Sequence, residues 1–277
     1  MKAKAIRRNL GTGLRTAVLC LFLVFFTLPI LWVFLTSIKR PVDQMAIPPV
    51  WFPENPVFDA YLELFRHPDF VTSLLNSLLI AGTATLITVL FGALAAYGIE
   101  RFRVGGTLLP NLLLLTRMIP PVVVIVPIFL MAFRTQMLDT YFLIIAAYSA
   151  LNMALVIWLL RSFFASLPAD MEEAAMIDGC SRLHAFWRIV LPVVMPGIAA
   201  TALICFIFCW NEFLFAVTLT GQETKTMPVL TSTFVSQKGL DRGLMSASGV
   251  VSSLPIVLLT VFFQRYLVNG LTQGSLK

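Results

Sequence analysis

The sequence is poor in charged residues. Asp, Glu, Lys and Arg make up 12% of its 277 residues, whereas soluble domains carry roughly 25%. A folded domain surrounded by water needs a polar surface, so this composition argues against a water-soluble protein.

Histidine and cysteine are scarce as well. His67 and His184 lie in separate polar segments, and Cys205 and Cys209 share a helix face without a histidine near them. The four cysteines therefore indicate neither a metal site nor a disulfide framework. The Gly-x-x-x-x-Gly-Lys-Ser/Thr phosphate loop is also absent. We expect no catalytic residue, no metal site and no ATPase site in this chain, so that any work it does draws energy from an ion gradient or a partner.

Long apolar runs dominate instead. Hydrophobic residues make up 58% of the chain, and the mean hydropathy is +0.89. Six runs are long enough to cross a bilayer, at about 17–38, 70–99, 108–133, 141–163, 193–219 and 244–268. The predicted fold class is an all-α integral membrane protein with a six-span domain over 17–268, an N-terminal tail at 1–16 and a C-terminal tail at 269–277. The first run lacks a small-x-small cleavage site, so it is interpreted as a retained span rather than a signal peptide.

Basic residues predict the orientation. Six spans place both tails on one side of the membrane. Of the 20 Lys and Arg residues, 12 fall on that side, 7 fall on the other, and Arg117 lies within a span. The excess predicts cytoplasmic N- and C-termini, and these positions account for the net charge of +6 without nucleic acid.

The segment from Ser166 to Gly197 is the longest charged interval between two spans, and its part at 166–191 is built as structure. Pro168 suits a first helical turn, and Gly179 suits a left-handed helix stop. Ser181 can then cap a second, amphipathic helix from Arg182 to Leu191. The segment is either a docking element or a solvated linker, and composition does not decide between them.

A motif in this segment resembles the EAA loop of ABC-importer permease subunits. It reads EAAMIDGCSRLHAFWRIVLPVVMP, with Glu173-Ala174-Ala175 four residues before Gly179. The resemblance implies that the first helix is a coupling helix seated on a cytoplasmic ATPase subunit. The residues implied in ATPase coupling are Glu172, Glu173, Ala174, Ala175, Met176, Ile177, Asp178, Gly179 and Phe186.

Three further matches resemble the carbohydrate-uptake branch of that family, specifically its maltose-type second permease. They are Asn76-Ser77, Ala95-Ala96-Tyr97 and Trp210-Asn211-Glu212-Phe213. The terminal RYLVNGLTQGSLK is similar to that branch's tail, which implies ATPase contacts by Gly274, Ser275 and Lys277.

That resemblance implies a type I ABC importer permease fold in a bacterial inner membrane, with a sugar or polyol as solute. The implied partners are a homologous second permease forming a heterodimer, two ATPase subunits that bind ATP and Mg, and an extracytoplasmic solute-binding protein. The alternatives to a sugar or polyol importer are an importer for another solute, such as glycerol phosphate, and an ion-coupled carrier. The carrier would predict inverted repeats and several intramembrane acids.

Arg117, Asn211 and Glu212 are the polar candidates within the spans, and Pro120, Pro121 and Pro127 interrupt the span that holds Arg117. Three hypotheses remain open. Asn211 and Glu212 line the solute path, Glu212 pairs with Arg117 to stabilise the fold, or span five ends early and leaves Glu212 near the outer surface.

The polar loop at 220–243 follows span five. By the resemblance, it faces the binding protein through Thr231, Ser232, Thr233 and Phe234; the alternative is a plain connector.

Overall fold

The computed structural model describes residues 2–168, 170–236 and 239–273, with side chains for 15–168, 170–235 and 241–264. Within these residues every regular element is a helix except for a hairpin of β1 (Val235–Ser236) and β2 (Gly239–Leu240), in which Val235 pairs with Leu240. The chain divides into two compact units. The bundle unit holds Pro68–Leu230 and the chain from Leu254 onward, and the N-terminal unit holds the chain up to His67 together with Thr231–Ser253.

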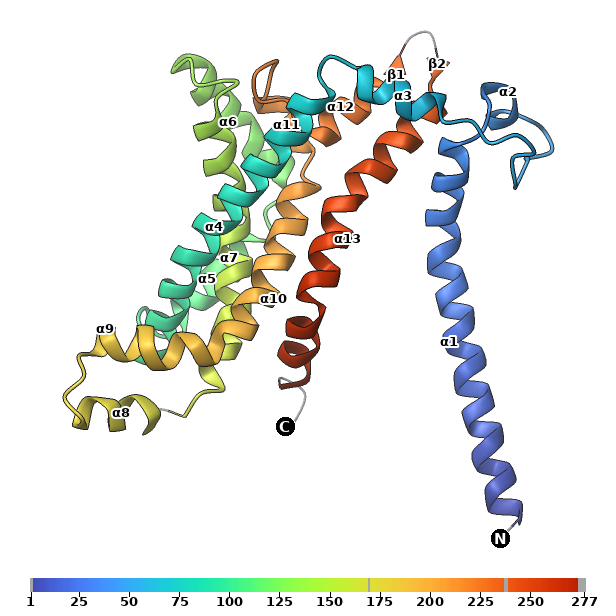
Figure 1. The fold of residues 1–277 in the computed structure, drawn as a ribbon. Coiled ribbons are helices and arrows are strands. Elements are labelled where there is room, and N and C mark those ends of the chain that lie inside the picture. Colours follow the sequence, from blue (N-terminus) through green and yellow to red (C-terminus); the bar gives the residue numbers. More distant parts are fainter. Residues whose placement is uncertain (1, 169, 237–238, 274–277) are drawn as a thin grey trace. The chain divides into compact units, whose positions relative to one another are not determined.

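Three long helices form the centre of the bundle unit. They are α4 (Phe70–Phe102), α7 (Tyr141–Ala165) and α10 (Leu191–Trp210), and each contacts the other two (Figure 1). Ile80 of α4, Leu160 of α7 and Cys205 of α10 are completely buried in the shared core. Leu86 and Phe142 on the outer faces stay exposed, which costs little beside lipid tails that are as apolar as leucine.

Two glycines let these helices come close together. A Cβ at Gly92 of α4 would lie 2.6 Å from Cγ1 of Val156 on α7, and one at Gly197 of α10 would lie 2.5 Å from the Phe163 ring. Gly92 and Ala96 form a small-xxx-small pair, and Ala96 is fully buried. Backbone approach of this kind replaces the hydrophobic effect as a source of helix association in lipid.

The remaining helices of the bundle unit are shorter. They are α5 (Leu108–Thr116), α6 (Pro121–Arg134), α8 (Asp170–Ile177), α9 (Arg182–Ala185), the π-helical η1 (Phe186–Val190) and α11 (Leu214–Leu219), while α12 (Met227–Thr233) runs past Leu230 into the other unit. The helix predicted from Arg182 to Leu191 does not stand apart from span five, because α9, η1 and α10 follow one another without a break.

Two of the predicted spans are broken. Helices α5 and α6 bend by 84° at Arg117–Pro120, because Pro120 and Pro121 have no N–H to continue the helical ladder. Helix α10 ends at Trp210, and α11 begins only at Leu214, so the span predicted at 193–219 consists of two helices. Among the described residues, five helices are long and apolar enough to cross a membrane, or six if the bent pair counts as one span.

The N-terminal unit contains α1 (Lys2–Ser37), α2 (Pro41–Gln44), α3 (Asp59–Arg66), the hairpin and the start of α13 (Arg242–Gln273). Trp32 packs edge-on against Trp51, and the Lys39 ammonium lies 3.9 Å from the centre of the Trp32 ring. Burial lowers the pKa of Lys39 although Asp43 opposes the shift. Most apolar side chains of the candidate span at the end of α1, Arg15–Ser37, are exposed, and Leu35 near its end is buried.

Asp139, between α6 and α7, organises the turn that follows α11. Its carboxylate accepts hydrogen bonds from the backbone N–H groups of Gly221, Glu223 and Thr224 and from the Thr224 hydroxyl, at 2.6–3.1 Å. Burial alone would raise the pKa of Asp139, but these hydrogen bonds outweigh it and lower that pKa, so the group is ionised at neutral pH. A Cβ at Gly221 would lie 2.5 Å from Oδ2 of Asp139, so the turn needs glycine there.

The same turn is tied to the start of α4. Asn76 donates to the carbonyls of Glu223 and Lys225, Tyr141 donates to the Asn76 side chain, and Lys225 pairs with Asp69 at 2.6 Å. The turn after α11, the start of α7 and the start of α4 therefore form one polar cluster.

We predict that Asp139→Ala destabilises the protein by about 1–3 kcal/mol, because several N–H groups lose their acceptor. Thermal unfolding of the purified protein in detergent checks this, with Asp59→Ala as the matched control, since Asp59 is exposed on α3. Equal melting temperatures for the two variants would contradict the assigned role.

Candidate functional site

The charged segment at 166–191 contains a helix and a glycine corner, as predicted, but Pro168 precedes α8 rather than lying in its first turn, and the second helix continues into α10. Asp170, Glu172 and Glu173 occupy the first turn of α8, where negative charge stabilises the helix N-terminus. Gly179 has φ +86°, a left-handed conformation that glycine adopts without a steric penalty. The Ser181 hydroxyl then accepts from the backbone N–H of His184 and caps α9.

An ion pair fastens α8 to the end of α4. The Glu172 carboxylate accepts from the Tyr97 hydroxyl at 2.7 Å and from Nε of Arg101 at 2.6 Å. Arg101 also donates to the carbonyl of Leu167 at 3.2 Å. The segment is thus held to α4 at two places by one arginine.

An aromatic cluster makes the second attachment. Phe186 at the start of η1 is buried, with its ring 4.6 Å from that of Tyr97 on α4 and 6.4 Å from that of Phe164 on α7. A displacement of α8 and η1 would therefore move the side chains of α4 and α7 that contact Phe186.

The predicted coupling residues separate into two faces. Glu172, Ala175 and Phe186 turn inward and are buried or half-buried. The others are exposed: Glu173, Ala174, Met176, Ile177, Asp178 and Gly179. We call these six residues the open face of α8. Ile177 leaves 85% of its surface uncovered on this face, which is unusual for an isoleucine in a segment too charged for lipid.

A cavity of about 260 Å³ lies between α8, the end of α4 and α9, and Glu173 and Met176 of the open face border it as well. Arg101, Glu172, Glu173 and Arg182 line it. Charges of both signs therefore surround this space.

A larger cavity of about 510 Å³ lies where the broken spans meet α7. Arg117 comes from the break between α5 and α6, Glu212 from the break between α10 and α11, and Asn152 from the middle of α7. We call it the break cavity. An unpaired arginine at a bilayer centre costs about 2.5–3.5 kcal/mol on insertion scales, so this face of the bundle needs water or a polar partner.

Arg117 and Glu212 line this cavity but do not pair. Arg117 donates to the carbonyl of Leu151 at 2.9 Å, whereas the Glu212 carboxylate accepts from the backbone N–H groups of Phe215 and Ala216 at 3.0–3.2 Å. Among the described residues no ion pair joins the two side chains. The structure therefore contradicts the pairing hypothesis, because the Glu212 carboxylate accepts hydrogen bonds from the backbone N–H groups at the start of α11 instead.

The residues that line the break cavity beside Arg117 and Glu212 also differ from those predicted. Asn211 is absent from the cavity lining, and its amide donates back to the carbonyl of Ile207. Asn152 and Phe208 line the cavity instead and were missed by the sequence analysis. A polar Asn152 in the middle of an apolar run was a signal for the first, whereas Phe208 looks like any other apolar residue of its helix.

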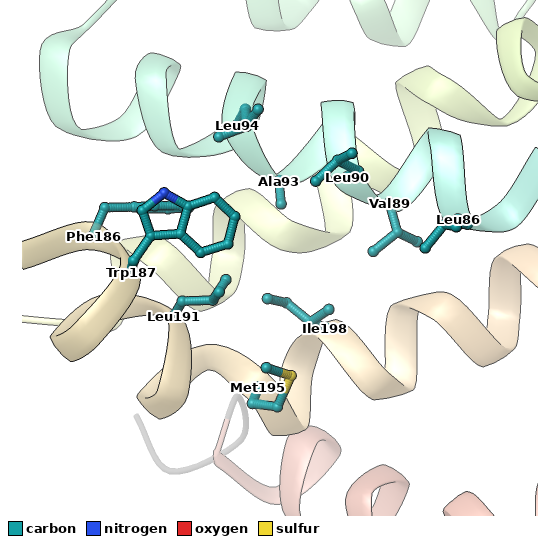
Figure 2. A pocket seen from close by; sticks show the side chains of 10 residues that line it. All are labelled: Leu86, Val89, Leu90, Ala93, Leu94, Phe186, Trp187, Leu191, Met195 and Ile198. Carbon is teal, nitrogen blue, oxygen red and sulfur yellow. The ribbon is translucent and has the colours of Figure 1, made fainter. Parts of the chain in front are cut away.

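A groove of about 170 Å³ lies between α4 and the helices η1 and α10. Figure 2 shows Leu86, Leu90 and Leu94 of α4 on one side and Trp187 and Ile198 on the other. Its lining is wholly apolar, so it offers nothing that could orient a hydroxylated solute, and lipid tails can cover it.

The residues predicted to contact a binding protein lie at the end of α12 and just after it. Phe234 is buried against His67, with ring centres 5.6 Å apart, and Thr231 hydrogen-bonds Ser248 at 2.6 Å. Ser232 is half-buried and Thr233 is exposed. Thr233 is thus the most accessible of the four side chains.

Two other predictions concern the tail and metals. Gly274, Ser275 and Lys277 lie outside the described residues. Among the residues that the structure describes, His, Cys, Asp and Glu side chains form no group able to hold a metal ion.

The sequence matches the family described as "Binding-protein-dependent transport system inner membrane component" over residues 88–273. This range contains the charged segment, the break cavity and both broken spans.

Three relatives align over nearly the whole chain. "Probable ABC transporter permease protein y4oR" of Sinorhizobium fredii is 36% identical over 93% of this chain and 93% of its own. "Sulfoquinovosyl glycerol transport system permease protein SmoH" of Agrobacterium fabrum is 32% identical over 96% and 94%. "Trehalose/maltose transport system permease protein MalG" of Thermococcus litoralis is 34% identical over 94% and 93%.

Two solved structures share the fold. A chain of a bacterial ABC transporter involved in the import of the acidic polysaccharide alginate has a TM-score of 0.77 at 24% identity, over 92% of this chain and 95% of its own. A chain of the bacterial alginate transporter in complex with pentasaccharide-bound periplasmic protein has a TM-score of 0.69 at 19% identity, over 94% of each chain.

We predict that Arg101→Gln loosens α8 by about 1 kcal/mol, the usual net contribution of a hydrogen-bonded contact to stability. Amide hydrogen exchange should then become roughly five-fold faster over Asp170–Ile177. Arg161→Gln is the matched control, because it breaks the pair between Arg161 of α7 and Glu100 of α4 without touching α8. Unchanged exchange in Arg101→Gln would refute the anchoring role.

We predict that Glu212→Ala destabilises the protein by about 1 kcal/mol, the usual cost of losing a helix-capping acceptor. Adding Arg117→Gln should change stability independently, to within about 0.5 kcal/mol. A double-mutant cycle on thermal unfolding measures this, and a clear coupling energy would restore the ion-pair hypothesis.

Proposed function

Because the chain belongs to the family of binding-protein-dependent transport system inner membrane components, we propose that it is one of two permease subunits of an ATP-driven importer for a sugar or a polyol. The sugar assignment is supported by relatives whose names include trehalose, maltose and sulfoquinovosyl glycerol. A homologous second permease completes the pathway, and two separate ATPase subunits bind ATP and Mg.

The observation that carries this proposal is the two-faced construction of α8. Its inner face is bound to α4 through Glu172 and Arg101, and the six residues of its open face are exposed. A solvated linker would need no ion pair to hold it against the bundle. A docking helix needs both a rigid attachment and an accessible surface.

The same contacts describe how force crosses the chain. An ATPase subunit that moves the open face pulls on α4 through Glu172, and on α4 and α7 through Phe186. The continuous path from α9 through η1 to α10 ends beside Glu212 at the break cavity. Switching between two packed arrangements then opens the path to either side in turn.

The proposed orientation puts α8 and both termini in the cytoplasm of a bacterial inner membrane. The end of α12 with Thr233 then faces an extracytoplasmic solute-binding protein. Gly274, Ser275 and Lys277 of the tail add ATPase contacts. The excess of Lys and Arg on the α8 side supports this orientation.

The test is a pull-down from membranes in which this chain is produced together with a second permease, ATPase subunits and a binding protein encoded by genes next to its own. We predict that Glu173→Arg combined with Gly179→Pro abolishes co-purification of the ATPase and ATP-driven uptake. The charge reversal alters the open face, and proline cannot adopt the φ of +86° at Gly179.

Uptake is measured in proteoliposomes with trehalose, maltose, sulfoquinovosyl glycerol and glycerol phosphate as separate solutes. Glu54→Arg is the control, because Glu54 is an exposed acid of the N-terminal unit. ATPase binding and uptake that survive in the double variant would remove the docking assignment. Uptake of glycerol phosphate alone would remove the sugar assignment.

A further inference from the structure

The break cavity contains one charged side chain with unused hydrogen-bonding capacity. A guanidinium has five N–H donors, and in the described part of the chain the Arg117 side chain donates only to the Leu151 carbonyl. Arg117 is exposed, so its remaining donors are accessible from the cavity that it lines.

The facing carboxylate does not neutralise this charge. Both oxygens of Glu212 accept backbone N–H groups of Phe215 and Ala216. The carboxylate is therefore held in place by α11, and among the described residues it forms no ion pair with Arg117, whose remaining donors can bind an acceptor from outside the chain.

An aromatic ring lies next to these donors. Phe208 of α10 lines the cavity with half of its surface exposed, and Cζ of Arg117 lies 6.0 Å from the centre of its ring. A sugar ring has an apolar face of C–H groups and a rim of hydroxyl oxygens. An aromatic ring beside a fork of donors matches those two features, because one buries the apolar face and the other binds the oxygens.

The size of the cavity agrees with a small solute. Its volume of about 510 Å³ falls within the ~300–1,000 Å³ of small-molecule sites, which are mostly apolar with a few polar groups. The groove in Figure 2 is a useful contrast, because its lining includes the aromatic Trp187 but exposes no polar surface to the groove.

We propose that the break cavity is a solute subsite of this chain, in which Arg117 binds oxygen atoms of a sugar whose apolar face packs on Phe208. This inference rests on the proposed function, and it adds that this chain contacts the solute itself. Hydroxyl and anionic oxygens share the required chemistry, so both neutral and acidic sugars satisfy the site. Asn152 and Glu212 complete the polar part of the wall.

The experiment uses the complete transporter in proteoliposomes. The probes are labelled trehalose as the neutral sugar and sulfoquinovosyl glycerol as the acidic one, and uptake is measured with whichever of them the wild type carries. Arg117→Gln should lower uptake at sub-saturating solute about ten-fold, the usual effect of losing a hydrogen bond to a charged group. Phe208→Leu should lower it roughly three-fold, because packing area is lost while the site stays apolar.

Matched controls separate recognition from folding. Arg134→Gln and Phe142→Leu change an exposed arginine of α6 and an exposed phenylalanine of α7 that do not line the cavity, and uptake should stay at the wild-type rate. Co-purification of all subunits is measured for every variant. Arg117→Lys keeps the charge but loses the fork, and should fall between wild type and Arg117→Gln.

The results divide clearly. Reduced uptake by assembled Arg117→Gln and Phe208→Leu transporters supports the subsite, and a loss confined to the acidic sugar assigns Arg117 to its anionic group. Wild-type uptake by both variants overturns the subsite while leaving the proposed function intact. Loss of subunit assembly in both variants overturns it too, because these side chains would then hold partners rather than solute. A wild-type transporter that imports glycerol phosphate with ATP but none of trehalose, maltose and sulfoquinovosyl glycerol removes the sugar assignment and the subsite together.

Discussion

The ion pair between Arg101 and Glu172 is the contact on which the functional arrangement depends. Without it, α8 would be a short charged helix joined to the bundle only by the Tyr97–Glu172 hydrogen bond and its flanking chain, and an eight-residue helix is marginal alone. Because Arg101 sits at the end of α4, the pair converts α8 into an extension of the longest bundle helix. The Phe186 ring adds a contact to α7. The open face of α8 is thus presented by a rigid support.

The breaks in two spans, unlike this ion pair, destabilise the structure. Each interrupts a helical ladder inside an apolar layer, where unsatisfied backbone groups are expensive. The structure offsets this locally: the Glu212 carboxylate accepts the N–H groups that begin α11, and Pro120 and Pro121 have no N–H to leave unpaired. The breaks therefore bring polar side chains of distant segments into one cavity. In the bundle unit, the helices that pack closely at glycines are rigid. The polar side chains lie where the spans are interrupted.

Much of this organisation could be predicted from the residues. The apolar runs predicted where the long helices lie, and Gly179 and Ser181 predicted the corner in the charged segment. The pairing of Arg117 with Glu212 could not be judged, because it depends on how two broken spans rotate. Asp139 was missed for a similar reason. Its hydrogen bonds reach residues about 80 positions away, and sequence spacing does not report such contacts.

By itself the sequence determined that this is a helical membrane protein with one charged, structured segment, because hydropathy and helix-stop chemistry act over a few neighbouring residues. Only the tertiary structure decided which side of α8 stays open, which residues share the break cavity, and that Phe234 is buried. These outcomes depend on the rotation and close approach of packed helices. Side-chain contacts between distant segments set both, and no local pattern encodes them.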